Sequence, residues 1–183
     1  MSMMRFRVLF RELGTQETRT VHVLESSPSN YDLPVDEYGF EELYCTERRC
    51  DCRRVMINVL ARYARRHVAT INHAFEKPAK DAHVPEQTFL DPLNSQSELA
   101  PMLLKLFAEV VLSDPGYRQR LVRHYHLFKR VVDDPAHPDH RLTREGFDPE
   151  IDVEPDQPAA AGPRRRTPIL PPPPRRGKKK KWK

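Results

Sequence analysis

Residues 38–62, YGFEELYCTERRCDCRRVMINVLAR, place two apolar segments on either side of a cysteine cluster. The segments YGFEELYC (38–45) and RRVMINVLAR (53–62) are typical of β-strands, because branched and aromatic side chains fit a pleated surface. The turn between them holds Cys45, Cys50 and Cys52, and no cysteine occurs elsewhere in the chain. Residues two apart on an extended chain share a face, and a tight turn folds Cys45 back toward the other two. The stretch therefore predicts a hairpin closed by a cysteine knuckle, with three converging thiols.

Three further segments extend the predicted sheet. RFRVLF (5–10) and TRTVHVL (18–24) alternate apolar with polar side chains around Gly14 and other polar residues, which is typical of the two strands of a hairpin. VATINHAF (68–75) is a fifth candidate strand, and the charged, proline-containing residues 76–88 predict a loop. We therefore expect a mostly antiparallel sheet of about five strands within residues 5–75.

The apolar period changes in the second half of the chain. Apolar side chains recur there at three- and four-residue spacing, which predicts amphipathic helices. Asp114-Pro115 ends the first helix and begins the second, because Asp is a good N-cap and Pro suits the first helical turn. Strands followed by two packed helices, about residues 97–132, predict the α+β class. The two apolar stripes are Leu99, Met102, Leu103, Leu106, Phe107, Val110 and Val111, then Tyr117, Leu121, Tyr125, Phe128 and Val132.

The chain divides into three regions by composition. Residues 1–134 hold all the periodic segments and predict a single domain. Residues 135–162 predict an acidic, proline-rich linker, in which EGFDPEIDVEPD (145–156) has six acids and no base. Residues 163–183, PRRRTPILPPPPRRGKKKKWK, predict a disordered basic tail, because such a segment has too few apolar side chains to offset its ordering entropy.

Charge is distributed as unevenly as proline. Residues 164–183 contain ten Lys and Arg and no acid, whereas the preceding 163 residues contain all 26 acids and 21 bases and have a net charge of −5. Any attraction to nucleic acid must therefore act through the tail. The chain has neither a run of about 18 to 20 apolar residues that would span a bilayer nor a signal peptide, so we expect a soluble cytoplasmic protein with no membrane partner. An odd number of clustered cysteines fits a reducing compartment.

Zinc is the metal that we expect at the knuckle, because thiolates favour it. Cys45, Cys50 and Cys52 supply three ligands, and a structural zinc site is tetrahedral, so a fourth ligand must come from elsewhere. A closed site would mean a structural role, and a water in the fourth position would mean catalysis. The candidates for the fourth ligand are the eight histidines together with Asp51 and Asp91. Among the histidines, His22 and His73 lie on predicted strands and could reach the turn, whereas His124 and His126 would need the second helix to pack near it.

Three other interpretations of the cysteine cluster stay open. The thiols can serve as small buried hydrophobes, and a disulfide between Cys50 and Cys52 lies near the upper limit of disulfide geometry. Alternatively, the arginines beside them make the thiols reactive by lowering their pKa. Those arginines, Arg48, Arg49, Arg53 and Arg54, also suggest an anion site. The more ordinary interpretation is a solvated hairpin tip whose positive charge is balanced by Glu41, Glu42, Glu47 and Asp51.

Other polar clusters have ordinary explanations. Asp91, Asn94 and Ser95 suggest a polar active-site loop, but an Asp-Pro turn followed by a Ser95 or Ser97 helix cap accounts for the same residues. His124 and His126 diverge by about 200° on a helix, so they do not share one metal and are expected at the surface or rim. His137 and His140 are expected in a solvated loop. Phosphate-binding glycine loops, Ser-His-Asp patterns and HExxH motifs do not occur in the sequence, which makes an enzyme the minority interpretation.

The run YCTERRCDCRRV (44–55) resembles the signature of a known family. With VATI (68–71), FLDPLNSQS (89–97), VLSDPGY (111–117) and RLVRHYHLFK (120–129), it is similar to a family of uncharacterised bacterial proteins marked by Tyr-Cys-x4-Cys-Asp-Cys-Arg-Arg. The resemblance covers roughly residues 38–130. It implies a cysteine knuckle and a bacterial context, it implies no particular chemistry, and it does not include the tail.

We therefore expect a non-enzymatic, zinc-stabilised module whose tail binds RNA, DNA or a ribonucleoprotein without sequence choice. The alternative is a protein-interaction adaptor, because Arg165, Pro168 and Pro171 fit an R-x-x-P-x-x-P ligand and the positive charge suits an acidic partner. Neutralisation of the tail by the acidic linker is a further possibility. A metal-dependent hydrolase or thiol redox enzyme is the third hypothesis. The expected nucleic-acid-binding residues are Arg164, Arg165, Arg166, Arg175, Arg176, Lys178, Lys179, Lys180, Lys181, Trp182 and Lys183.

Overall fold

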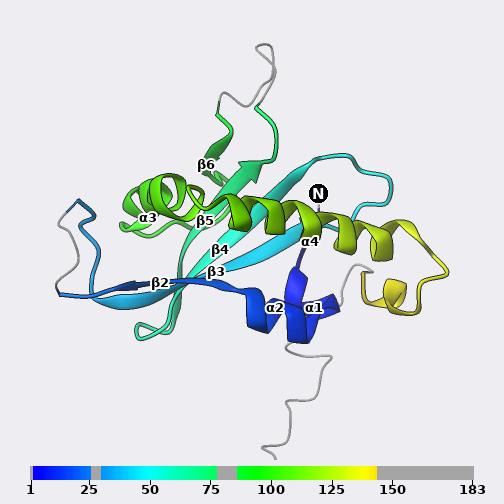
Figure 1. Cartoon of the computed structure of the whole chain (residues 1–183), viewed down its shortest axis with the longest axis horizontal. Coiled ribbons are helices and arrows are strands. Elements are labelled where there is room, and N and C mark those ends of the chain that lie inside the picture. The colour runs from blue at the N-terminus through cyan, green and yellow to red at the C-terminus, as the bar shows by residue number, and fades with distance from the viewer. Residues whose placement is uncertain (1, 26–29, 78–85, 144–183) are drawn as a thin grey trace, which may run out of the picture. The chain divides into compact units, whose positions relative to one another are not determined.

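A computed structural model describes residues 2–25, 30–77 and 86–143 of the chain. Within these residues the fold is α+β, as the sequence predicts, with an antiparallel sheet and several helices (Figure 1). The strands are β1 (Met3–Arg5), β2 (Arg19–Val23), β3 (Asp36–Cys45), β4 (Arg54–Ala61), β5 (Arg66–Ala74) and β6 (Thr88–Leu90). The helices are α1 (Phe6–Leu9), α2 (Arg11–Glu17), α3 (Ala100–Leu106) and α4 (Pro115–Asp133), with a π-helix η1 (Phe107–Val111) and a 3-10 helix η2 (Pro138–Thr143).

The sheet is organised around the long strand β3. Its strand order is β1-β3-β4-β5-β6, and β2 pairs with β3 as well. The three central strands, β3, β4 and β5, are those predicted from residues 38–45, 53–62 and 68–75, each shifted by one or two residues at its ends. Registers such as Phe40 opposite Val59 and Ile57 opposite Ile71 align apolar side chains on one face.

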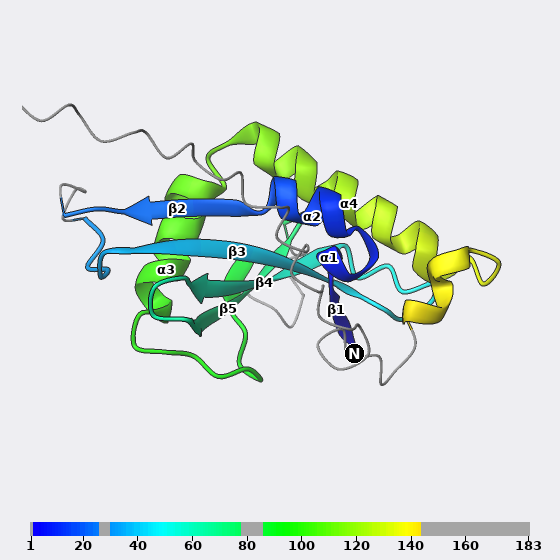
Figure 2. The ribbon, with the colours of Figure 1, turned by 90° about the horizontal axis from the view of Figure 1, so that it is seen from below.

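The N-terminal segment departs from the predicted hairpin. Strand β1 pairs with the end of β3, residues 43–45, and β2 pairs with its beginning, residues 36–40. Helices α1 and α2 lie between these two strands, where the sequence was expected to continue as a strand to residue 10 (Figure 2). The prediction of a hairpin from residues 5–10 and 18–24 is therefore wrong.

A helical spacing explains this difference. Phe6, Leu9, Phe10 and Leu13 recur at i, i+3, i+4 and i+7, and in the structure Phe6 is buried while the other three pack against the core. Arg and apolar residues also alternate at positions 5–8, and this alternation is typical of a strand. With a segment this short, contacts with the rest of the molecule decide between the two periods.

The helices cover one face of the sheet and enclose the core. The predicted stripe on α4, from Tyr117 to Val132, is buried, and α3 continues into η1, where Leu112 N donates to Phe107 O across five residues. Asp114 caps α4 by accepting a hydrogen bond from Gly116 N at 2.8 Å, as predicted. Within the described part of the chain, no helix combines the length and apolar character needed to cross a bilayer. The largest fully buried side chains are Tyr38, Tyr44, Tyr117, Phe40, Phe107 and Phe128.

Two features of the fold were missed in the sequence. Strand β6 lies at the end of residues predicted to be a loop, and it pairs with β5 through Ile71 and Leu90. Asp36 precedes the strand predicted from residue 38, but it is the buried first residue of β3, and its carboxylate accepts hydrogen bonds from Glu37 N, Tyr63 N and Ala64 N. Burial alone raises the pKa of a carboxyl group, and these N–H donors reverse the effect, so the pKa of Asp36 is lowered. The predicted acidic linker and basic tail lie outside the described residues, apart from residues 135–143.

Candidate metal centre

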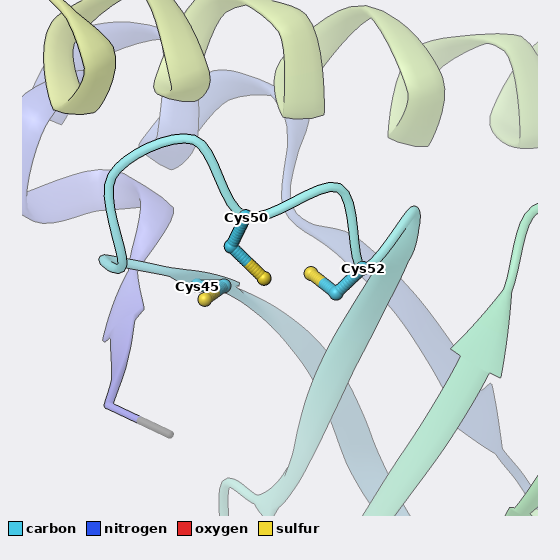
Figure 3. Close-up of side chains that lie close together, drawn as sticks. All are labelled: Cys45, Cys50 and Cys52. Atoms are coloured by element: carbon cyan, nitrogen blue, oxygen red, sulfur yellow. The ribbon is translucent and has the colours of Figure 1, made fainter.

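The β3–β4 connection brings the three cysteines together (Figure 3). Cys45 is the last residue of β3, and Cys50 and Cys52 precede the first residue of β4. A turn closed by Cys50 N donating to Glu47 O reverses the chain between them. The three sulfur atoms all lie within 4.8 Å of one another, so the convergence predicted from the spacing is present in the structure.

Two residues of the knuckle loop, residues 46–53, have a backbone conformation that is unfavourable for residues other than glycine. Arg49 has φ 58° and Arg53 has φ 45°, both in the left-handed region, which costs a non-glycine residue about 1 kcal/mol or more. Thr46 N donates to Ser2 O on one side of the loop, and Phe75 N donates to Arg53 O on the other. These two hydrogen bonds hold the loop at both of its ends.

One stripe of α4 contacts the knuckle loop. Lys129 Nζ donates to Glu47 O at 2.7 Å, and Arg49 N donates to Asp133 Oδ1 at 2.7 Å. One turn earlier on the same stripe, Tyr125 lies against the end of the loop. Burial raises the pKa of Tyr125 to about 12, with a further contribution from the neighbouring Cys52. Tyr125, Lys129 and Asp133 are spaced four residues apart, so they lie on one face of α4, and that face contacts the loop.

Cys45 and Cys52 are not activated in the manner of a nucleophile. Burial raises the pKa of Cys45, and burial together with the charges of the two neighbouring thiols raises the pKa of Cys52 to about 12. The prediction that the adjacent arginines lower the thiol pKa is therefore wrong for Cys45 and Cys52. Cys45 and Cys52 keep their protons unless a cation compensates the negative charge of the thiolate, and a bound metal ion does so.

The donor set fits a thiophilic metal ion. Zinc–thiolate bonds of about 2.3 Å in a tetrahedron place sulfur atoms about 3.8 Å apart, and the three sulfur atoms here all lie within 4.8 Å of one another. Three thiolates leave one position of a tetrahedral ion for a further ligand. Within the part of the chain that the structure describes, no histidine or carboxylate joins the three cysteines.

The proposed fourth ligands are engaged or placed elsewhere. His73 Nδ1 lies 2.8 Å from Thr88 Oγ1 in the β5–β6 ladder. His22 is exposed on β2 beside Glu37, and His126 is exposed on α4. Asp51 is exposed in the loop itself.

Asp91 serves the turn after β6. Its carboxylate accepts hydrogen bonds from Leu93 N, Asn94 N and the side chains of Asn94 and Asn72. Ser97 Oγ accepts from Leu99 N at the start of α3. The Asp-Pro turn of the ordinary interpretation is therefore present, and Ser97 stabilises the turn before α3, whose N-cap residue Leu99 has no side-chain cap. The carboxylate of Asp91 is occupied by these turn contacts, which speaks against a polar active-site loop at Asp91, Asn94 and Ser95.

Two of the acidic residues expected to pair with the loop arginines, Glu41 and Glu42, have other partners. Glu41 pairs with Arg7 at 2.5 Å on the far side of the sheet, and Glu42 is turned toward α4. Arg53 pairs with Glu76 at 2.7 Å. The balanced hairpin tip predicted from Glu41 and Glu42 is therefore wrong for these two residues.

A buried polar cluster between α2, β3 and α4 was missed. His124 Nδ1 lies 2.7 Å from Glu42 Oε2, and His124 Nε2 lies 3.1 Å from Glu17 Oε2, while Tyr44 OH donates to Glu42 at 2.9 Å. The ring of His124 is 1% exposed and stacks on Phe6, so its predicted place at the surface or rim is wrong. A cavity of about 10 Å³ beside it is about the size of one water molecule. The spacing of His124 from Leu121 and Phe128 on the α4 stripe was the available signal for burial.

Comparison with known proteins adds no identity. No family model, curated protein or solved structure matches the chain. The eleven tail residues predicted to bind nucleic acid, from Arg164 to Lys183, lie outside the described residues.

Proposed function

We propose that the protein is a non-enzymatic, zinc-stabilised module that binds nucleic acid through its cationic tail. The observation that carries the proposal is the convergence of the three thiols of Cys45, Cys50 and Cys52 within 4.8 Å. Zinc suits three thiolates better than any oxygen-preferring ion, and it needs no redox chemistry. We assign the cysteines a structural role and place the protein in the cytoplasm, where thiols stay reduced.

The position of the site supports a structural role. The loop joins β3 to β4, contacts Ser2 next to β1 and contacts α4. A metal ion that links Cys45 to Cys52 would cross-link the end of β3 to the beginning of β4. Since such an ion binds only the folded loop, its binding free energy adds to the free energy of unfolding.

The zinc half of the proposal is tested by metal content. We expect about one zinc per chain in the purified full-length protein by elemental mass spectrometry, and none in Cys50→Ser. Removal of the metal with a chelator should lower the thermal midpoint by about 10 °C, equivalent to about 3 kcal/mol. Arg48→Gln is the matched control, because Arg48 is exposed in the same loop and is not a candidate ligand, so this variant should keep both zinc and stability. A metal-free protein of unchanged stability would exclude zinc.

The tail half rests on sequence. Ten bases and no acid follow residue 163, and Trp182 lies among them. Such a segment binds phosphates electrostatically and offers a ring on which bases stack. The folded part has no comparable excess of positive charge, since residues 1–163 are net negative.

A tail with four fewer positive charges tests this half in the full-length chain. Replacing Lys178, Lys179, Lys180 and Lys181 with Gln should weaken binding to a single-stranded 20-nucleotide RNA and lower the slope of log affinity against log salt by about 3, since each lost phosphate contact removes about 0.7. Replacing the same residues with Arg keeps the charge and should keep both. Equal binding by the Gln and Arg variants would contradict the proposal. Partners that stay bound after nuclease treatment would favour the protein-interaction adaptor.

A further inference from the structure

The three thiols are oriented by hydrogen bonds within the knuckle. Glu47 N donates to Cys45 Sγ at 3.4 Å, and Arg54 N donates to the sulfur of Cys52. The thiol of Cys50 forms hydrogen bonds with both other thiols. The three side chains therefore point to one position before any ligand binds (Figure 3), and this preorganisation lowers the entropy cost of a ligand that bonds to all three sulfur atoms.

The number of available ligands distinguishes between the soft ions that thiols bind. Zinc prefers four ligands in a tetrahedron, whereas among the residues that the structure describes only the three cysteines converge. Trivalent arsenic, As(III), forms three bonds in a trigonal pyramid, and its lone pair occupies the fourth direction. Three converging thiols therefore complete the coordination of As(III) without a further residue.

Charge distinguishes the same ions. Three thiolates give a zinc complex one net negative charge and a monovalent copper complex two, but they form a neutral complex with As(III). Cys45 is fully buried and the other two cysteines are half-buried, so a net charge at the site is costly. The arginine beside Cys52, Arg53, pairs with Glu76 at 2.7 Å and does not compensate such a charge.

We propose that the three-cysteine site binds As(III) in competition with zinc. The reaction needs no oxidant or reductant: arsenous acid, As(OH)3, condenses with three S–H groups, three As–S bonds replace three As–O bonds, and three water molecules leave. From the zinc-bound site the same exchange takes up three protons and releases Zn²⁺. The half-buried Cys50 and Cys52 are the accessible entry points, and the buried Cys45 forms the remaining bond.

Titration of the reduced full-length protein with arsenite tests the proposal. We expect one arsenic per chain by elemental mass spectrometry, and an intact mass that rises by one arsenic atom less three hydrogen atoms. In the zinc-loaded protein each bound arsenic should release one zinc, as measured with a chromogenic zinc indicator. An adduct that retains an As–OH group on two thiols would overturn the three-thiol site.

Single substitutions show whether every thiol forms a bond. Cys45→Ser, Cys50→Ser and Cys52→Ser should each weaken arsenite binding at least about 10-fold, because only two As–S bonds remain. Phenylarsonous acid has two exchangeable As–OH groups and bonds to two thiols, so it should bind Cys45→Ser about as tightly as the wild type. Arsenite affinity that is unchanged in Cys45→Ser would overturn the proposal. If this variant loses both probes because the loop does not form, the intact mass of the wild-type adduct decides.

This proposal and the proposed function fail separately. A zinc-bound protein that keeps its zinc and takes up no arsenic from a tenfold excess of arsenite overturns this proposal alone. A protein that is purified without zinc but binds As(III) through three thiols overturns the zinc half of the proposed function and supports this proposal. Arg48→Gln, which changes an exposed side chain of the same loop, should bind arsenite like the wild type.

Discussion

His73 shows how one residue changes its character when the sheet forms. In the sequence it is a candidate metal ligand, but in β5 its side chain is buried beside Phe75 and Phe107 and bonded to Thr88. Burial lowers the pKa of His73 to about 4, and the positive charge of Arg118 contributes in the same direction. The imidazole is therefore neutral in the folded protein at neutral pH.

This depressed pKa predicts acid sensitivity. Between pH 6.5 and pH 4, His73 is protonated in the unfolded chain but stays neutral in the folded protein. The free energy of unfolding therefore falls as the pH drops from about 6.5 to about 4. The loss is about 1.4 kcal/mol per pH unit and reaches about 3 kcal/mol. In His73→Gln this loss should be absent, as measured by urea unfolding at pH 7, 5.5 and 4.5.

The exposed histidine His22 provides the control. His22→Gln should keep the wild-type pH profile, because its side chain is 59% exposed. A wild-type profile in His73→Gln would show that other groups cause the acid sensitivity.

At the scale of elements, the N-terminal helices depend on one close approach. A Cβ added at Gly14 in α2 would lie 2.8 Å from Arg7 Cβ and 2.9 Å from Arg7 Cα in α1. Real side chains do not approach this closely, so the two helices must separate before any larger residue fits. Gly14 therefore sets the distance between α1 and α2, and with it the depth at which Phe6 enters the core.

Gly14→Ala should destabilise the protein by about 1 to 3 kcal/mol, because the clash outweighs the better helix propensity of alanine. Gly39→Ala in β3 is the control, since the atom nearest to its added Cβ is Leu60 O at 4.0 Å. That variant should be neutral or stabilised by up to about 1 kcal/mol. Chemical unfolding of both variants measures the difference, and equal effects would show that the helices adjust freely.

Other elements were predictable because their patterns are long. The stripe of α4 spans about four turns and identifies a helix whatever it packs against, and β3, β4 and β5 each hold at least eight residues. Strand β6 has three residues, which is too few for a period to be recognised. The segment at residues 5–10 fits two periods, and its burial against His124 and Tyr44 selects the helix.

At the scale of the whole molecule, residues far apart in the sequence create the buried cluster of Glu17, Glu42 and His124. The ring of His124 links α4 to α2 on one side and to β3 on the other. No spacing rule connects residues 17, 42 and 124, so the cluster follows from the packing of the three elements and not from a local pattern. The knuckle is the opposite case, because its three cysteines lie within eight residues.

The sequence by itself determined the α+β class, the three central strands, the long helix with its Asp114 cap and the meeting of three thiols. Each of these depends on local periodicity or on spacing along a short stretch of chain. Only the tertiary structure decided that residues 6–9 and 11–17 are helical, that His73 and His124 are buried and that Glu41 and Glu42 turn away from the loop arginines. It also decided that α4 contacts the knuckle loop through Lys129 and Asp133. The physical reason is that burial and charge pairing depend on which elements pack together. Hydrophobic periodicity predicts which face of a helix or strand is buried, but it does not predict which other element packs on that face.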